Sequence, residues 1–272
     1  SNNIVSFNNV STNQGDGIGF YLSGGNTLSS NFVLQNNVGI AIRGIYDMPP
    51  YTSSNNTLRN NVLVNNYNNF GIDGLDLQAF IQDIDTSNTV DGKPIYYLIN
   101  KSHFAVPSDA GYVGIINSTD ITVKGLNLRR NAQGVLLAYT TDSQVADNNI
   151  TKNWWGVQLL QSSRITVFNN SLTGNFFGMD VFRSSQNIIT ANNMTSSDMA
   201  GLAIRASSGN DVYQNNINGN MDFGIQLFTS DNNVIRGNNV VDNYFSISFA
   251  SSYGNRIYHN NFISRVYGRN WY

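Results

Sequence analysis

The stretch NNINGNMDFGIQL, Asn215 to Leu227, contains the repeated pattern from which the fold can be predicted. It begins with an asparagine pair and ends, after Gly224, in an alternation of apolar and polar residues. Asparagine pairs are poor material for helices and for strand interiors, whereas a period-two alternation indicates a short strand. The pattern recurs through the second half of the chain. Its asparagine pairs begin at Asn148, Asn169, Asn192, Asn215, Asn238 and Asn260, in steps of 21 to 23 residues.

A glycine column runs parallel to the pairs, at Gly134, Gly156, Gly178, Gly201 and Gly224. A unit of about 22 residues with three short strands cannot bury its own apolar face, so copies of it must stack. The sequence therefore predicts an all-β fold, a right-handed parallel β-helix (solenoid) of about 9–10 coils of 22–23 residues with one inserted segment.

Identical residues lie above one another in such a stack. Asn tolerates the left-handed backbone of a tight corner, and its amide can bond both the local backbone and the next Asn. We predict that Asn148, Asn169, Asn192, Asn215, Asn238 and Asn260 form a hydrogen-bonded structural ladder. Ladder packing is the alternative to an asparagine-lined sugar site, and the regular spacing favours the ladder.

Composition supports an all-β chain and excludes several functions. Apolar residues make up 40% and charged residues 12%, and all 17 acidic residues are Asp. The absence of Glu and the scarcity of Lys argue against surface helices. A net charge of −2 gives no electrostatic footprint for nucleic acid, and no apolar run reaches the roughly 20 residues of a membrane span. Without Cys there are no disulfides or thiolate chemistry. The chain opens inside a repeat, so we expect a piece of a longer protein.

One long segment interrupts the rhythm. We predict coils over 1–77, an insertion on the side of the solenoid over 78–113 with a hairpin around VDGK, and further coils over 114–272, all in one continuous solenoid domain. A shorter insertion, Gly44 to Ser54, carries two prolines. Loops that leave a solenoid often carry its binding function.

The repeat "NN-φ-x-x-N-x-x-G-φ-x-φ" resembles the right-handed β-helix repeats of NosD-like proteins, in the carbohydrate-binding and sugar-hydrolase (CASH) group. The segment "NTVDGKPIYYLIN…VPSDAGYVGIINSTDITVKGLNL" is similar to one found in archaeal secreted and surface-layer proteins. The resemblance covers nearly the whole chain. It implies an extracellular or periplasmic β-helix, often on a cell surface and often without a demonstrated activity.

The strand after each glycine offers a candidate site on its outward face. Asp180, Arg183 and Arg205 are the catalytic candidates, with Gln158, Gln226, Phe182 and Phe228 as candidate ligand-binding neighbours. A hydrolase needs two carboxylates at one site, and only Asp180 is acidic on this patch. A lyase or epimerase needs a base and a charge stabiliser, which Asp180 and the arginines could supply.

Aromatic residues precede the glycine column in several coils. Trp154 and Trp155 lead this stripe, followed by Phe176 and Phe177. Adjacent residues on a strand point to opposite sides, so one of each pair is expected outside. The stripe is either corner packing or a platform for saccharide rings, and the sequence leaves both open.

The sequence was searched for ligands of two metals, Ca²⁺ and copper. The best acidic cluster, a weak Ca²⁺ candidate, is Asp73 and Asp76 with Asp83 and Asp85; solvated surface carboxylates are the alternative. The resemblance also raises copper, whose soft ligands are Cys, Met and His. Cys is absent, His103 and His259 are far apart, and the Met residues are scattered. We therefore predict no cofactor and no copper site.

Seven Asn-x-Ser/Thr sequons occur in the sequence. Asn55, Asn100 and Asn117 are the glycosylation candidates because they lie in or near insertions, whereas Asn149, Asn169 and Asn193 are expected to point inward.

The first functional hypothesis is a non-catalytic extracellular or cell-surface module, structural or adhesive, that binds a polysaccharide or cell-surface glycan. Because exposed coil ends present unpaired strand edges, we expect them to meet flanking domains or other copies end to end. The alternative is a polysaccharide lyase, hydrolase or epimerase that acts on the glycine-strand face. A viral tail-fibre segment is a third reading.

Overall fold

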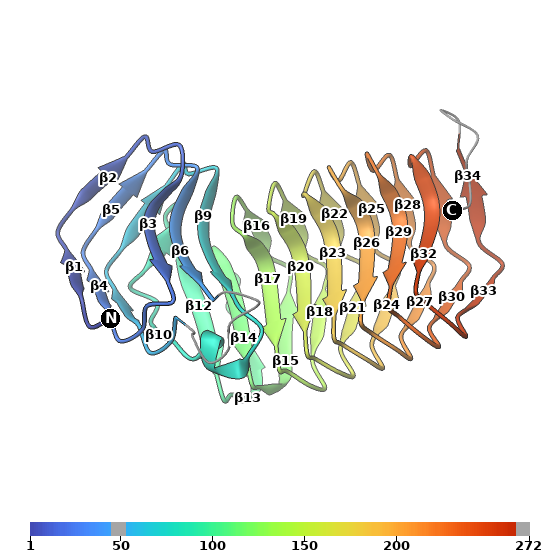
Figure 1. Cartoon of the computed structure of the whole chain (residues 1–272), viewed down its shortest axis with the longest axis horizontal. Helices are drawn as coiled ribbons and strands as arrows, with labels where there is room; N and C mark the ends of the chain where they lie inside the picture. Colours follow the sequence, from blue (N-terminus) through green and yellow to red (C-terminus); the bar gives the residue numbers. More distant parts are fainter. Residues whose placement is uncertain (45–52, 265–272) are drawn as a thin grey trace.

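The computed structural model describes residues 1–44 and 53–264. Most of the predicted insertion 44–54 lies outside them. The chain winds into two blocks of stacked parallel coils, set at an angle to each other along one rod with the termini near its opposite ends (Figure 1). The first block ends with a strand at Val90, and the second begins at Lys93. No helix of the described residues is long and apolar enough to cross a membrane.

The first block has three strand columns. They are β1 (Ile4–Ser6), β4 (Thr27–Ser29), β7 (Thr57–Arg59) and β10 (Asp83–Ile84); β2 (Asn9–Ser11), β5 (Phe32–Leu34), β8 (Val62–Val64) and β11 (Thr89–Val90); and the long strands β3 (Asp16–Tyr21), β6 (Val38–Arg43) and β9 (Asn68–Asp73). A short 3-10 helix, η1 (Leu77–Phe80), follows β9.

The second block has three columns of its own. The long strands are β12 (Lys93–Ile99), β14 (Tyr112–Ile116), β17 (Gln133–Ala138), β20 (Trp155–Leu160), β23 (Phe177–Phe182), β26 (Ala200–Arg205), β29 (Phe223–Phe228) and β32 (Phe245–Ala250). The second column is β13 (Ser102–Ala105), β15 (Thr119–Lys124), β18 (Gln144–Ala146), β21 (Thr166–Phe168), β24 (Ile188–Thr190), β27 (Asp211–Tyr213), β30 (Val234–Arg236) and β33 (Arg256–Tyr258). The third is β16 (Asn127–Arg129), β19 (Asn149–Thr151), β22 (Ser171–Thr173), β25 (Asn193–Thr195), β28 (Asn216–Asn218), β31 (Asn239–Val241) and β34 (Asn261–Ile263).

The parallel β-solenoid predicted from the repeat is confirmed. Three long strands in the first block and eight in the second give about 11 turns, more than the 9–10 predicted. The difference comes from the segment predicted as an insertion. β10 and β11 pair with the first block, and β12 and β13 begin the second, so most of 78–113 belongs to the stack. The prediction of a lateral insertion was wrong for these strands, and only η1 lies outside the strand columns.

The glycine column reflects the close approach of successive coils. A Cβ atom on Gly178 would lie 2.5 Å from the carbonyl oxygen of Gly201 in the next coil, and one on Gly156 would lie 2.4 Å from that of Gly178. Such distances are too short for any side chain, so the stack requires glycine at these two positions, whereas Ser246 takes the equivalent place in β32, the last long strand described.

The asparagine ladder is confirmed with one correction. The ladder consists of Asn148, Asn170, Asn192, Asn215, Asn238 and Asn260, and the backbone N–H of each rung donates to the Oδ1 of the rung that follows. The predicted member Asn169 is instead exposed at a corner with φ +53 and donates to Asp147. Because its pair is shifted by one residue along the coil, the second Asn fills the ladder.

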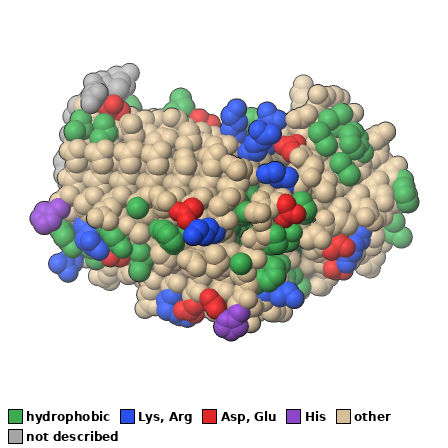
Figure 2. All heavy atoms as spheres, turned by 180° about the vertical axis from the view of Figure 1, so that it is seen from behind, with side chains coloured by type: hydrophobic (Ala, Val, Ile, Leu, Met, Phe, Trp, Pro, Cys, Tyr) green, Lys and Arg blue, Asp and Glu red, His purple; other side chains and the backbone are tan. Residues whose placement is uncertain are grey.

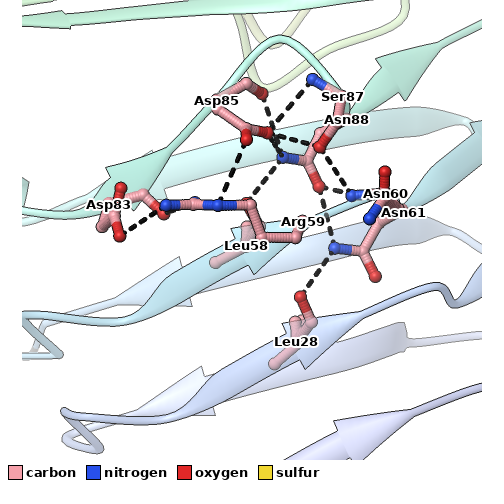
Figure 3. Close-up of polar contacts among 9 residues, drawn as sticks. All are labelled: Leu28, Leu58, Arg59, Asn60, Asn61, Asp83, Asp85, Ser87 and Asn88. Atoms are coloured by element: carbon pink, nitrogen blue, oxygen red, sulfur yellow. Dashed lines mark hydrogen bonds and ion pairs between the residues drawn. The ribbon is translucent and has the colours of Figure 1, made fainter.

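Other ladders stand at the remaining corners. In the first block, Asn61 donates 2.8 Å to Asn88 Oδ1 and 3.0 Å to the Leu28 carbonyl, a rung drawn in Figure 3. One ladder is interrupted where the blocks meet. There the buried Nδ2 of Asn69 and the buried Oδ1 of Asn131 find no partner among the described residues.

The two blocks share one twelve-stranded sheet and use opposite faces of it. In β14, Tyr112 and Ile116 pack into the core of the first block, whereas Val113 and Ile115 pack into the core of the second. Every residue of β14 and β17 is therefore buried. Parallel strands covered on both faces read as continuous apolar runs, as VGII and GVLLA do here.

An antiparallel hairpin makes this change of face. Val90 pairs with Lys93 across Asp91 and Gly92, which have φ of +47 and +79, the left-handed pair that a type I′ turn requires. The hairpin predicted around VDGK is confirmed.

We expect Gly92→Ala to lower the free energy of unfolding by about 1–2 kcal/mol, because an added Cβ finds open space but enforces a left-handed alanine. Gly15→Ala is the matched control, since Gly15 also has open space but no positive φ. Urea unfolding of both variants measures the difference, and equal losses would contradict the role given to the turn.

Candidate functional site

Two of the three catalytic candidates meet. Arg205 binds Asp180 through two bonds, Nε to Oδ1 at 2.8 Å and Nη2 to Oδ2 at 2.6 Å. The Asp180 side chain is fully buried and that of Arg205 is 34% exposed. Arg183 lies elsewhere, exposed at a corner with its guanidinium 5.1 Å from the centre of the Phe182 ring. A carboxylate closed off by a bidentate arginine is poorly placed to receive a substrate proton.

A row of buried, hydrogen-bonded polar side chains continues from this pair. Gln158 donates to Asp180 at 3.3 Å, Gln133 donates to Gln158 at 3.2 Å, and Tyr112 donates to Gln133 at 3.2 Å. Gln158 is only 4% exposed. Burial raises the pKa of the Tyr112 hydroxyl, which keeps it protonated as the donor. This row of polar side chains lies on the face that β14, β17 and β20 turn toward the first block. The predicted substrate face is therefore buried inside the protein in these coils.

The other predicted ligand residues of this face lie further along the rod. Phe182 and Gln226 are half-buried and Phe228 is 53% exposed. Phe182 packs under Arg205, whose guanidinium is 5.3 Å from its ring. These residues do not converge with Gln158 on one open site.

The two tryptophans lie at the surface. Trp154 is 41% exposed and stacks on Phe176, with ring centres 4.2 Å apart and planes at 24°. Trp155 is half-buried, meets Trp154 edge-on, and buries its indole N–H without a partner among the described residues. One ring of the pair was expected outside; Trp154 is exposed, but Trp155 is also partly accessible and lines the same space.

These aromatic rings line a hollow where the blocks meet. A space of about 720 Å³ lies between the long strands of the first block and the start of β17 and β20 in the second. A second space of about 390 Å³ adjoins it, and both are lined by Tyr67, Asn68 and Trp154. We call the two together the junction groove. Ala132 N donates 2.9 Å to the Phe70 carbonyl, and a Cβ on Gly71 would collide with Ala132, so the groove floor is closed.

The first block contributes a polar cluster to the groove. Arg43 bonds the Tyr21 hydroxyl at 2.9 Å and Asp16 Oδ1 at 3.3 Å, and Tyr21 donates to Asp16. The bond to Asp16 raises the pKa of the Tyr21 hydroxyl, so it stays protonated. Tyr21, Arg43 and Asp73 are aligned across β3, β6 and β9.

Sequence reasoning missed Asp16, Tyr21, Arg43 and Tyr67. The repeats that contain these residues can be recognised in the sequence. An alignment of the repeats of the first block would have placed Tyr21, Arg43 and Asp73 in one column. Nothing in the sequence places that column opposite Trp155, because the approach depends on how the blocks meet.

The acidic cluster predicted for Ca²⁺ does not assemble. Asp83 and Asp85 are both engaged by Arg59, with nitrogen–oxygen distances of 2.6 Å and 3.1 Å (Figure 3). Asp73 lines the groove and Asp76 lies exposed before η1. Across residues 1–44 and 53–264, no group of three or more His, Cys, Asp or Glu side chains is arranged to hold a metal ion.

The sequon asparagines are exposed. Asn55, Asn100 and Asn117 are exposed, and Asn117 donates 2.7 Å to Asn100. Asn149, Asn169 and Asn193 are exposed as well, so the expectation that they point inward was wrong. In the asparagine pairs, the inward partner is the ladder residue, and its neighbour must face out.

The family model described as periplasmic copper-binding protein (NosD) matches residues 1–96 and 84–269. No curated protein sequence matches significantly. Among solved structures, the Azotobacter vinelandii mannuronan C-5 epimerase AlgE4 A-module is 15% identical, with a TM-score of 0.46, covering 99% of this chain and 90% of that one. The periplasmic alginate epimerase AlgG is 16% identical, with a TM-score of 0.40, covering 92% and 63%. The tailspike protein 2 of bacteriophage CBA120 is 12% identical, with a TM-score of 0.38, covering 89% and 33%.

This chain therefore spans less than two thirds of the AlgG and tailspike chains. Similarity at this level does not indicate a shared substrate or activity.

The copper in the family's description does not fit the described residues. His103 in β13 hydrogen-bonds Asp120 in β15, and His259 follows β33 at the other end of the same sheet, roughly 34 Å away at one strand spacing per coil. Met179 and Met194 are fully buried in the core. These side chains cannot converge on one soft-ligand site.

Proposed function

The chain belongs to the NosD family, and on this premise we propose that it is a carbohydrate-binding module that works outside the cytoplasm and holds a polysaccharide segment in the junction groove. The family's periplasmic description and its solenoid fold support this setting. The observation that carries the proposal is the Trp154–Phe176 stack, which presents an open aromatic face on the wall of the groove.

Three features suit a sugar chain. Sugar rings have apolar faces that pack on aromatic rings, and Trp154, Trp155 and Tyr67 offer such surfaces. Hydroxyl groups need donors and acceptors, which Asn68 and the Asp16–Tyr21–Arg43 cluster provide. The groove is pre-formed, because its walls belong to paired strands, and a rigid site loses little entropy on binding.

We expect Trp154→Ala to weaken polysaccharide binding at least about tenfold, since a central aromatic contact is the type that dominates an interface. The measurement is affinity electrophoresis against a panel of soluble polysaccharides, followed by calorimetry with the best ligand. Tyr244→Ala is the control, because Tyr244 takes the place of Trp154 in a later coil, is 43% exposed and lies outside the groove. Equal loss in both variants, or no binding by the native chain to any polymer, would reject the groove as the site.

A second candidate function is catalysis, in which the protein chemically modifies the bound polysaccharide. The groove holds Tyr21, Arg43 and Asp16 in direct contact, and these groups could supply the base and the charge stabiliser that a lyase or epimerase needs. If it acts this way, incubation with uronate polymers gives unsaturated ends or altered epimer content, and Tyr21→Phe abolishes the change. Unaltered polymer leaves binding alone as the function.

A further inference from the structure

Cations without carboxylate partners gather where the blocks meet. Of the Lys and Arg side chains in 1–44 and 53–264, six form ion pairs: Arg43, Arg59, Lys124, Arg164, Arg205 and Arg236. Among the residues the structure describes, seven others have no such pair within 4 Å, and four of these, Lys93, Arg129, Arg130 and Lys152, line the spaces at the junction. Figure 2 shows Lys and Arg side chains grouped near the middle of the rear face, whereas most of that face is uncharged.

Arg130 and Lys152 occupy equivalent corners of successive coils. Each precedes a rung of one ladder, since Asn131 N donates 3.0 Å to Asn153 Oδ1, so the two backbones are about 4.8 Å apart. Arg130 donates 3.1 Å to the amide oxygen of Asn65, a neutral partner that leaves its charge uncompensated. Like charges on neighbouring strands destabilise a sheet. Folding therefore gives no reason for this pair.

The cations flank the aromatic stack. Arg130 and Lys152 line the same space as Trp154 and Phe176, with Asp198 as its one carboxylate. Arg129 and Lys93 line the next space, together with Asp91. A sugar ring seated on Trp154 would thus have two cations within reach of an acidic substituent.

We infer that the ligand of the groove is an acidic polysaccharide, whose carboxylate or sulfate groups are bound by Arg130 and Lys152. The inference rests on the proposed function and narrows it, because a neutral glycan would leave the charges of the half-buried Arg130 and the exposed Lys152 without an anionic partner. Charge attraction between exposed groups is screened over roughly 10 Å at 0.1 M salt, so binding should weaken as ionic strength rises.

The experiment compares polymers that differ only in charge. Calorimetry would use polygalacturonate against its methyl ester, and dextran sulfate against dextran, which separates a carboxylate from a sulfate ligand. We expect the native chain to prefer the acidic member of one pair, and the Arg130→Gln/Lys152→Gln variant to bind that member about tenfold more weakly. Binding of the neutral member should not change.

Lys101→Gln/Arg256→Gln is the matched control, because it removes two unpaired cations that lie outside the groove. The inference is overturned if acidic and neutral members bind equally, if neither acidic polymer binds, or if the control loses as much affinity as the groove variant. Binding of a neutral polymer that depends on Trp154 would still uphold the proposed function, so the two failures are distinguishable.

Discussion

Replacing Asn215 with alanine is expected to lower the free energy of unfolding by at least about 3 kcal/mol, because the change leaves several buried polar groups without partners. Asn215 is 1% exposed. Its Oδ1 accepts from the backbone and side chain of Asn192, at 2.9 Å and 3.1 Å. Its Nδ2 donates to the Ile189 and Tyr213 carbonyls and to Asn238. Alanine cannot replace any of these bonds, and water cannot reach them.

The neighbouring Asn216 provides the control within the same pair. It faces outward and bonds only other surface amides, donating 2.7 Å to Asn193 and accepting from Asn239. Asn216→Ala should cost less than about 1 kcal/mol because water can satisfy the freed groups. Thermal unfolding followed by circular dichroism compares the two, with a drop of roughly 6–12 °C expected for Asn215→Ala. Similar drops for both variants would show that the inner ladder is not what stabilises the coil.

The second large effect concerns the buried ion pair. We expect Asp180→Ala to destabilise the chain by about 3–5 kcal/mol, because Arg205 would keep its charge in a largely buried position without its carboxylate. Gln158 would also lose its acceptor. Urea unfolding at neutral pH measures the loss.

A double variant separates the pair's net contribution from the cost of breaking it. Asp180→Leu/Arg205→Met replaces both charges with apolar groups and should recover most of the stability. Its polysaccharide binding should equal that of the native chain, because neither residue lines the junction groove. A double variant as unstable as Asp180→Ala would contradict this account. Loss of polysaccharide binding in the double variant would show that Asp180 and Arg205 contribute to the binding site.

The structure of a single coil could be predicted from the sequence. The ladder asparagines, the glycine column and the alternating strands follow from a repeat in which each coil contacts only its neighbours, so local pattern and tertiary contact coincide. The one slip in the ladder, Asn169 in place of Asn170, has the same origin. A shift of one residue reverses which side chain faces inward, and a pair of identical residues conceals such a shift.

The tertiary structure alone decided the meeting of the blocks. The hairpin at Asp91 and Gly92 could be predicted from the sequence. That the strand after it turns its opposite face to a new core could not be predicted. That change buried Gln158 and Asp180 on the predicted substrate face, and it brought Tyr21 and Arg43 opposite Trp155. A repeat specifies contacts one coil away. The hydrogen bonds between the blocks, such as those from Gln133 to Ile72 and from Gln161 to Leu75, join residues 61 and 86 positions apart, so no local pattern encodes them.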